Sequence, residues 1–351
     1  MLRALKLATL RMAGRTGLNS VLLDSPWRRR RLLILCYHGV SLEDEHEWGP
    51  ALYIPPALFR DRMEALRRMD CSVLPFGDAL ARLYAGTLPP RAVTITFDDG
   101  AYDFYKVAWP ILRDYGFPAT LYFTTYYSLY NRPVFDVMLS YLLWKGRLRS
   151  LAWPEVLPAP VLLDERGRQQ AGSHIRRHAR QAGLSAAEKD AVLAQLAARL
   201  DVGYEALCAK RILHLMTPAE AAEMAAAGVD IQLHTHRHRV SLQRDVFLKE
   251  VEDNRRAIAA VSPRPAVHFC YPCGLYEPEF REFLRSAGVE SAAMSGAGLA
   301  GRGTDPYSLP RLADVSTLTP AEFEAWVSGL ASFLPRRALP ENLGPLLEGA
   351  E

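Results

Sequence analysis

The chain has 351 residues, of which 49% are hydrophobic and 23% charged, a balance typical of a folded protein with a substantial core. A net charge of +3 excludes a strongly basic nucleic-acid-binding protein, and no apolar run reaches the roughly 20 residues that cross a bilayer. The charge is unevenly placed, because residues 1–31 contain eight Lys and Arg but one Asp. This segment predicts either a basic amphipathic helix on an anionic membrane or a helix packed on the rest of the chain.

The N-terminus has no uninterrupted apolar stretch, since Arg3, Lys6, Arg11 and Arg15 divide it, and this argues against a cleaved secretory signal. The five cysteines are too few for a disulfide scaffold and are odd in number. We therefore expect reduced thiols and a cytoplasmic location. An additional expectation, left open by the sequence, is peripheral contact of residues 1–31 with the inner face of the membrane.

From residue 32 onward, strand and helix patterns alternate. The predicted elements are a buried strand at 32–37 ending at His38, a helix at 55–69, a strand at 71–76, a helix at 76–86, a strand at 93–97, a helix at 108–116 and a strand at 118–125. Such alternation predicts an α/β fold with a mostly parallel sheet or barrel.

The alternation is interrupted at residues 131–212, which are largely helical and polar, and we expect a helical insertion there. The α/β pattern then resumes with a helix at 217–228, a strand at 229–234, a helix at 242–260 and strands at 266–272 and 289–295. Residues 32–130 and 213–330 are thus predicted to form one domain. Residues 331–351, interrupted by Pro and Gly, are predicted to be a peripheral tail.

Two stretches carry residues suited to chemistry. In "VTITFDDG" a strand-like alternation ends in Asp98, Asp99 and Gly100, so that one carboxylate could bind a metal while the other takes a proton; a solvated turn is the alternative. In "VDIQLHTHRH" three histidines crowd the end of a strand, and imidazole is a common zinc ligand. His236 is expected to point away from its neighbours. Because the carboxyl ends of parallel strands share one face, the two stretches can meet there.

Together with "FCYPCG" (269–274), the motifs "TFDDG" and "HTHRH" resemble, in this order, those of the polysaccharide deacetylase family, also called NodB-homology or carbohydrate esterase family 4 domains. The resemblance implies a deformed (β/α) barrel, often of seven strands. It implies that Asp98 is the catalytic base and that Asp99, His234 and His238 bind one divalent metal, most simply Zn²⁺. The variant third motif is similar to the YPxG branch, which includes poly-N-acetylglucosamine deacetylases.

The sequence departs from the family pattern in two respects. The arginine that usually precedes the third motif is absent, and Arg311 is a candidate substitute beside Asp98, with an ordinary surface or core-edge salt bridge as the alternative. The resemblance assigns a backbone N–H of this motif to the oxyanion, and Tyr271 is our candidate. No histidine follows His268, so the usual general acid is missing. His38 is the proposed substitute, with a buried loop-orienting histidine as the alternative.

The resemblance thus implies a metal-dependent hydrolase that removes an N-acetyl group from an amino-sugar-containing saccharide. The alternatives are a de-O-acetylase or deformylase on the same barrel, or a degenerate carbohydrate-binding barrel without activity. Cys270 and Cys273 have the spacing of a redox dithiol, but no thioredoxin-like helix follows them, and we expect no redox role.

Overall fold

The computed structural model describes residues 7, 9, 10, 12 and 16–334. The chain divides into two compact units. Among the described residues, one unit takes in those up to Leu129 and those from Met216 onward, and the other is Tyr130–Leu215. The second unit begins and ends within three residues of the insertion that the sequence predicts.

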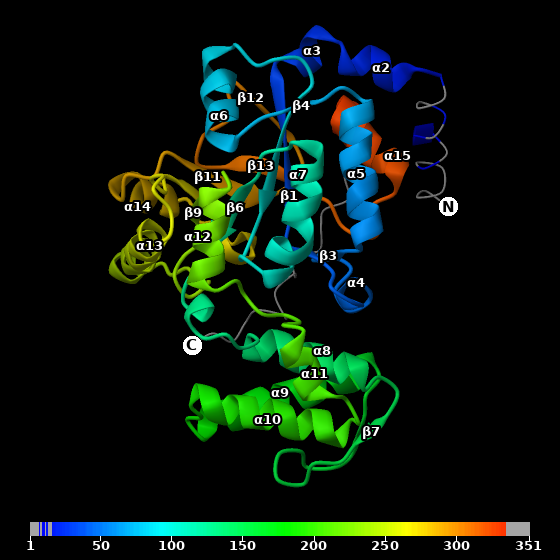
Figure 1. Ribbon diagram of the computed structural model, residues 1–351, viewed down its shortest axis with the longest axis vertical. Coiled ribbons are helices and arrows are strands. Elements are labelled where there is room, and N and C mark those ends of the chain that lie inside the picture. The colour runs from blue at the N-terminus through cyan, green and yellow to red at the C-terminus, as the bar shows by residue number, and fades with distance from the viewer. Residues whose placement is uncertain (1–6, 8, 11, 13–15, 335–351) are drawn as a thin grey trace. The chain divides into compact units, whose positions relative to one another are not determined.

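The first unit is built on a closed ring of seven parallel strands (Figure 1). In ring order these are β1 (Arg31–Tyr37), β13 (Leu309–Ala313), β11 (Ser291–Ser295), β10 (His268–Cys270), β9 (Asp230–Leu233), β6 (Thr120–Phe123) and β5 (Ala92–Phe97), which pairs again with β1. Two further strands add to this ring, β4 (Ser72–Val73) parallel to β5 and β12 (Leu299–Gly301) antiparallel to β1. The prediction of an α/β fold of the (β/α) barrel type is confirmed.

Helices surround the ring and bury apolar side chains against it. They are α5 (Pro56–Arg68), α6 (Phe76–Ala85), α7 (Trp109–Tyr115), α12 (Pro218–Ala226), α13 (Arg244–Ala259), α14 (Phe280–Ser286) and α15 (Pro320–Ser328). A capping box of Thr217 and Glu220 begins α12. β12 and β13 are not among the strands predicted from the sequence, because both are short and lie in a segment rich in Gly and Pro.

Eleven of the 31 residues of the N-terminal segment lie outside the described residues, so the choice between a membrane helix and a packed helix stays open for it. Of its described part, Leu10 is buried against Ala325 and Ala331, and the helices α2 (Leu18–Leu23) and α3 (Pro26–Arg29) follow. Arg28, one of its eight basic residues, is fully buried and donates to the carbonyl oxygens of three residues. The predicted tail is described only to residue 334, where a short 3₁₀ helix, η4 (Leu330–Phe333), has formed.

The second unit is mainly helical. It contains α8 (Phe135–Lys145), a two-stranded ribbon of β7 (Ser150–Leu151) and β8 (Val161–Leu162), and then α9 (Glu165–Gln181), α10 (Ala186–Arg199) and α11 (Tyr204–Ala209). A capping box of Ser185 and Glu188 begins α10. Its buried side chains, among them Leu142, Ile175 and Leu193, come from three helices and give the unit an apolar interior of its own.

Candidate active site

The residues singled out by the sequence gather where barrel strands end. His38, Asp98, His234 and Tyr271 each follow the last residue of a strand, which are β1, β5, β9 and β10. All seven strands of the ring run in the same direction, so these positions lie at one end of the barrel. This end is therefore the candidate active site.

Asp98 is buried and held by Arg311 of β13. Arg311 donates from Nη1 to Oδ1 at 2.6 Å and from Nη2 to Oδ2 at 2.7 Å. Burial alone would raise the pKa of Asp98, but the Arg311 guanidinium outweighs burial and lowers this pKa to about 2. Arg311 is only 1% exposed, so the surface salt bridge that the sequence left open for it is excluded.

Asp99 faces the other way, toward two histidines. Its Oδ1 lies 3.1 Å from Nε2 of His234 and 3.1 Å from Nε2 of His238. Burial would raise the pKa of Asp99, but His238 and His234 outweigh it and hold this pKa well below its ordinary value. One carboxylate oxygen and two imidazole nitrogens thus converge on one point, and this donor set suits zinc and similar divalent metals.

The backbone of this cluster takes conformations that non-glycine residues rarely adopt. Asp99, Thr235 and His238 all have φ between 56° and 69°. Gly100 follows with φ 87°, and a Cβ there would meet the Phe123 ring at 2.2 Å, so this position of the motif requires glycine. Such strained residues persist only where their surroundings fix them, which is common at functional sites.

His234 is oriented by contacts outside the cluster. Its Nδ1 lies 2.9 Å from the carbonyl oxygen of Cys270, so Nδ1 carries a proton, and Nε2 lies 3.1 Å from Oδ1 of Asp99. Its backbone N–H donates to Oδ1 of Asn254 at 2.9 Å. Asn254 lies on α13, is fully buried and donates in turn to Phe123 O and Thr125 Oγ1, so it ties the ends of β6 and β9 together.

Glu250, one turn before Asn254 on α13, holds the rest of the histidine loop. Its carboxylate accepts the Arg237 N–H at 2.8 Å, the Arg237 guanidinium at 3.0 Å and the Arg239 guanidinium at 2.9 Å. The side chain of Glu250 is 2% exposed. Charge-assisted bonds in so buried a place are strong, and they fix the loop that carries His238.

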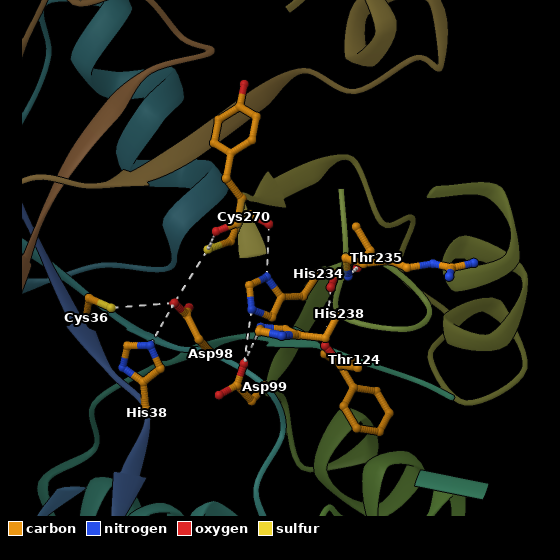
Figure 2. A network of polar contacts seen from close by, with 12 residues as sticks. Cys36, His38, Asp98, Asp99, Thr124, His234, Thr235, His238 and Cys270 are labelled. Carbon is orange, nitrogen blue, oxygen red and sulfur yellow. Dashed lines mark hydrogen bonds and ion pairs between the residues drawn. The ribbon is translucent and has the colours of Figure 1, made fainter. Parts of the chain in front are cut away.

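Three side chains besides Arg311 approach Oδ2 of Asp98. The thiols of Cys36 and Cys270 lie 3.6 and 3.5 Å from it, and Nε2 of His38 lies 3.8 Å from it (Figure 2). The Cys270 thiol also accepts from Nη2 of Arg311 at 2.9 Å. Burial raises the pKa of both thiols, so they are neutral neighbours of Asp98 rather than nucleophiles.

The remaining predicted residues lie in other settings. The Tyr271 N–H donates to the Ala293 carbonyl oxygen at 3.3 Å, a bond between strands that leaves this amide turned into the barrel wall and weighs against its predicted oxyanion role. His236 points away from the cluster, as expected, and its Nδ1 contacts Thr125 Oγ1 at 2.8 Å. Cys270 and Cys273 form no disulfide.

Sequence reasoning missed four residues of this site, namely Cys36, Cys270, Glu250 and Asn254. Their positions near the site depend on the closure of the ring or on the packing of α13 against it. No local sequence pattern predicts either of these. The arrangement places an ionised carboxylate, Asp98, beside three candidate metal donors, with the partly exposed His38 3.8 Å from that carboxylate. Side chains arranged in this way are suited to base-assisted attack of a water molecule on an acyl carbon.

The comparisons with known proteins agree with this geometry. The family model for polysaccharide deacetylases matches residues 85–292, which is more than half of the chain. The chain therefore belongs to the polysaccharide deacetylase family, and the resemblance noted in the sequence is confirmed.

Two curated relatives align with about a quarter of the chain. The chain is 34% identical over 93 residues to YxkH of Bacillus subtilis (strain 168), an alignment that covers 26% of this chain and 31% of that protein. It is 29% identical over 101 residues to the poly-beta-1,6-N-acetyl-D-glucosamine N-deacetylase of Escherichia coli (strain K12), covering 28% of this chain and 15% of that protein. Less than a third of either relative's length is therefore matched.

Solved structures share the fold over most of the chain. The Streptococcus pyogenes deacetylase PplD in complex with acetate has a TM-score of 0.56 at 18% identity and covers 87% of this chain and 99% of its own. IcaB from Ammonifex degensii has a TM-score of 0.52 at 17% identity and covers 85% and 97%. At such identities the likeness establishes the fold, a NodB-like deacetylase barrel.

Proposed function

We propose that the chain is a metal-dependent hydrolase that removes the N-acetyl group from amino-sugar units of a saccharide. The observation that carries the proposal is that the two neighbouring aspartates contact different partners. Asp98 is held by Arg311, and Asp99 faces His234 and His238. The alignment with a poly-beta-1,6-N-acetyl-D-glucosamine N-deacetylase supports an N-acetylglucosamine polymer as the first substrate to test.

Asp99, His234 and His238 would hold the metal. The fit rests on the convergence of their three donor atoms and on the bond from His234 Nδ1 to the Cys270 carbonyl, which is the outer support typical of metal-ligating histidines. A divalent metal bound there would polarise the acyl oxygen and lower the pKa of a water molecule.

Asp98 would take the proton of the attacking water. Its low pKa keeps it ionised at every physiological pH, so it is always able to accept, although it is a weak base. Arg311 fixes both carboxylate oxygens and thereby the direction in which the remaining lone pairs point. In this proposal Arg311 orients the base and keeps it charged.

His38 would donate a proton to the departing amine. Its Nε2 is 3.8 Å from Oδ2 of Asp98, and its side chain is 24% exposed, so it can exchange protons with solvent. An amine is a poor leaving group until it is protonated, and a protonated histidine within reach can donate that proton.

The other functions considered from the sequence are distinguished by substrate. A de-O-acetylase or deformylase would use the same residues on an ester or a smaller acyl group, and the fold does not choose between them. A degenerate barrel without activity is disfavoured, because the base and all three candidate ligands are in place. The cytoplasmic location stays a prediction of the sequence, and fractionation of the native host cell would test it; within the described residues no helix is both long and apolar enough to span a bilayer.

Metal content and turnover of matched histidine variants test the proposal. His238→Ala removes a candidate ligand, whereas His236→Ala removes a histidine from the same loop whose side chain contacts Thr125 instead. We expect bound zinc, measured by mass spectrometry after dialysis, to fall sharply in His238→Ala and to be kept in His236→Ala. Acetate release from N-acetylglucosamine oligomers should follow the same order. Equal metal content in the two variants would contradict the ligand assignment, and release from O-acetylated sugars alone would contradict the N-acetyl specificity.

A further inference from the structure

The second unit exposes apolar side chains beside basic ones at one end. Leu148 is 76% exposed and Leu162 is 55% exposed. Leu148 stands between the exposed arginines Arg147 and Arg149, just after α8 ends. We call Trp144, Lys145, Arg147, Leu148, Arg149 and Leu162 the ribbon tip.

The two leucines lie on hydrogen-bonded segments of the same ribbon. Ser150 pairs with Leu162 in the antiparallel ribbon, and the Leu148 N–H donates to the Leu163 carbonyl oxygen at 3.1 Å as the pairing continues. The Leu163 N–H returns a bond to the Arg149 carbonyl oxygen at 2.9 Å. The backbone at this point is therefore ordered, and it presents both leucines on a short, bonded ribbon rather than on a loose loop.

Leu148 combines two unfavourable features. It exposes a large apolar side chain, and its φ is +65°, a conformation that Gly or Asn adopts far more readily. A residue that is both strained and exposed contributes little to folding. Such a combination points to a role outside the chain.

The side chains next to the leucines are those found at a membrane–water boundary. The Arg147 guanidinium lies 4.0 Å from the centre of the Trp144 ring, and the Lys145 ammonium lies 5.2 Å from the Tyr141 ring and 5.7 Å from the Trp144 ring. Aromatic rings that support cations are typical of the headgroup layer. Residues 145–150 contain three basic residues and no acid, and residues 130–215 contain 13 Lys and Arg against eight Asp and Glu.

The acids nearest in sequence to the ribbon tip are Asp164 and Glu165, just after Leu162, and Glu155, whose carboxylate lies 3.8 Å from Nη2 of Arg199. The Asp164 side chain accepts the Gly167 N–H at 2.7 Å as the N-cap of α9, so it is engaged by its own helix. Arg149 donates from one nitrogen to the Leu200 carbonyl oxygen, and its exposed guanidinium has further N–H groups. The guanidinium groups of Arg147 and Arg149 therefore carry positive charge at exposed positions.

From this combination we infer that the ribbon tip docks on an anionic phospholipid surface, with Leu148 and Leu162 entering the acyl boundary and Arg147 and Arg149 on the phosphates. Stable attachment of a protein to a membrane generally takes two signals, apolar insertion and basic charge, and the ribbon tip provides both. Charge complementarity favours a lipid partner over an apolar protein groove. A nucleic acid would give the leucines no partner. The inference does not depend on the proposed catalytic function.

Vesicle sedimentation of the full chain tests this. We expect binding to vesicles of phosphatidylglycerol and phosphatidylcholine in equal parts and little binding to phosphatidylcholine alone. Leu148→Asn with Leu162→Thr should weaken binding roughly tenfold or more, and Arg147→Gln should weaken it several-fold. Leu148→Asn places a residue that favours positive φ at this position, so lost binding cannot be attributed to misfolding; a thermal melt checks this.

Leu242→Ser is the matched control, because Leu242 is 63% exposed but belongs to the barrel unit. It should bind vesicles as the unchanged chain does. The inference is overturned if the unchanged chain ignores anionic vesicles, if it binds neutral ones equally, or if Leu242→Ser loses as much as the ribbon-tip variants. It is also overturned if the ribbon-tip variants bind normally. Residues 1–31 would then be the candidate for the membrane contact.

Discussion

The barrel unit and the helical unit place their charged residues in opposite ways. In the barrel, Arg28, Arg62 and Arg311 are each 1% exposed or less, and Arg62 and Arg311 pair with the buried carboxylates of Asp314 and Asp98. In the helical unit, none of the 13 Lys and Arg is buried. A buried charge costs several kcal/mol unless it is paired, so each pair in the barrel is a constraint on geometry.

The difference indicates how each unit works. Buried pairs at strand ends orient functional groups. The Tyr37 hydroxyl donates to Asp314 at 2.8 Å, so the residue directly before His38 is also held by such a pair. Exposed charges are screened and mobile, and they act on partners at the surface. Substitutions in the two units should therefore differ in both the size and the kind of their effects.

The largest expected effect is that of Asp98→Asn. Asparagine keeps the shape but cannot take the proton, so turnover should fall by about 10²–10⁴-fold, the usual contribution of a general base. Bound metal should be kept, because Asp98 is not among the proposed ligands. Asp190→Asn in the helical unit, whose carboxylate pairs with Arg132, is the control and should leave turnover unchanged. A near-normal kcat for Asp98→Asn on a hydrolysed substrate would refute the assignment.

Arg311→Gln should come next, with effects on both stability and pH dependence. Removing one partner of a buried ion pair typically costs about 3–5 kcal/mol of unfolding free energy. In the unchanged chain, the pKa of Asp98 is lowered from 3.8 to about 2, so this pair stabilises the fold above about pH 4, and the stabilisation is lost as the pH falls toward 2.

Without Arg311, burial would dominate and raise the pKa of Asp98 above its ordinary value. The sign of the stability dependence then reverses, because the buried carboxylate ionises only against a cost as the pH rises. Since the base must be ionised to act, the acid limb of kcat/KM should move to higher pH. Urea unfolding and a pH–rate profile would measure the two effects, and an unmoved acid limb would mean that Arg311 does not control the charge of Asp98.

The His38→Ala variant tests whether His38 is an acid or only a loop-orienting residue, and its effect should be about tenfold to a hundredfold on kcat for an N-acetyl substrate. An aryl acetate should suffer less, because a phenolate can leave without a proton. Metal content should not change. Equal losses on the amide and the ester would assign His38 to orientation of Asp98, whose Oδ2 is 3.8 Å away, and the acid would have to be sought elsewhere.

Much of the barrel site could be predicted from the sequence because its chemistry lies at strand ends. Asp98, Asp99, His234 and His238 follow two strands whose period-2 pattern is legible, and a parallel fold brings such ends together. Arg311 is 213 residues from Asp98, and its pairing depends on β1 lying between β5 and β13 in the closed ring. No local sequence pattern predicts that strand order, so the pairing of Arg311 with Asp98 could not be decided from the sequence.

The thiols and the α13 residues were beyond sequence reasoning for the same reason. Cys36 and Cys270 approach Asp98 from strands that are not neighbours in the ring, and Asn254 reaches His234 from a helix. The oxyanion role of Tyr271 was assigned from its position in the motif. Which backbone groups are hydrogen-bonded, however, depends on strand register. In the register of β10 with β11, the Tyr271 N–H donates to the Ala293 carbonyl oxygen. Motif position predicts residue identity better than it predicts which backbone groups are free.

The smallest expected effect is that of the exposed pair of Arg132 and Asp190 in the helical unit. Their side chains are 46% and 28% exposed, so solvent screens the attraction, and such pairs contribute about 0–1 kcal/mol. Arg132→Gln should therefore change the unfolding free energy by less than about 1 kcal/mol, and added salt should reduce even that difference. Urea unfolding at low and high salt would measure it. A loss as large as that of Arg311→Gln would show that the helical unit also depends on fixed charges, and the contrast between the two units would fail.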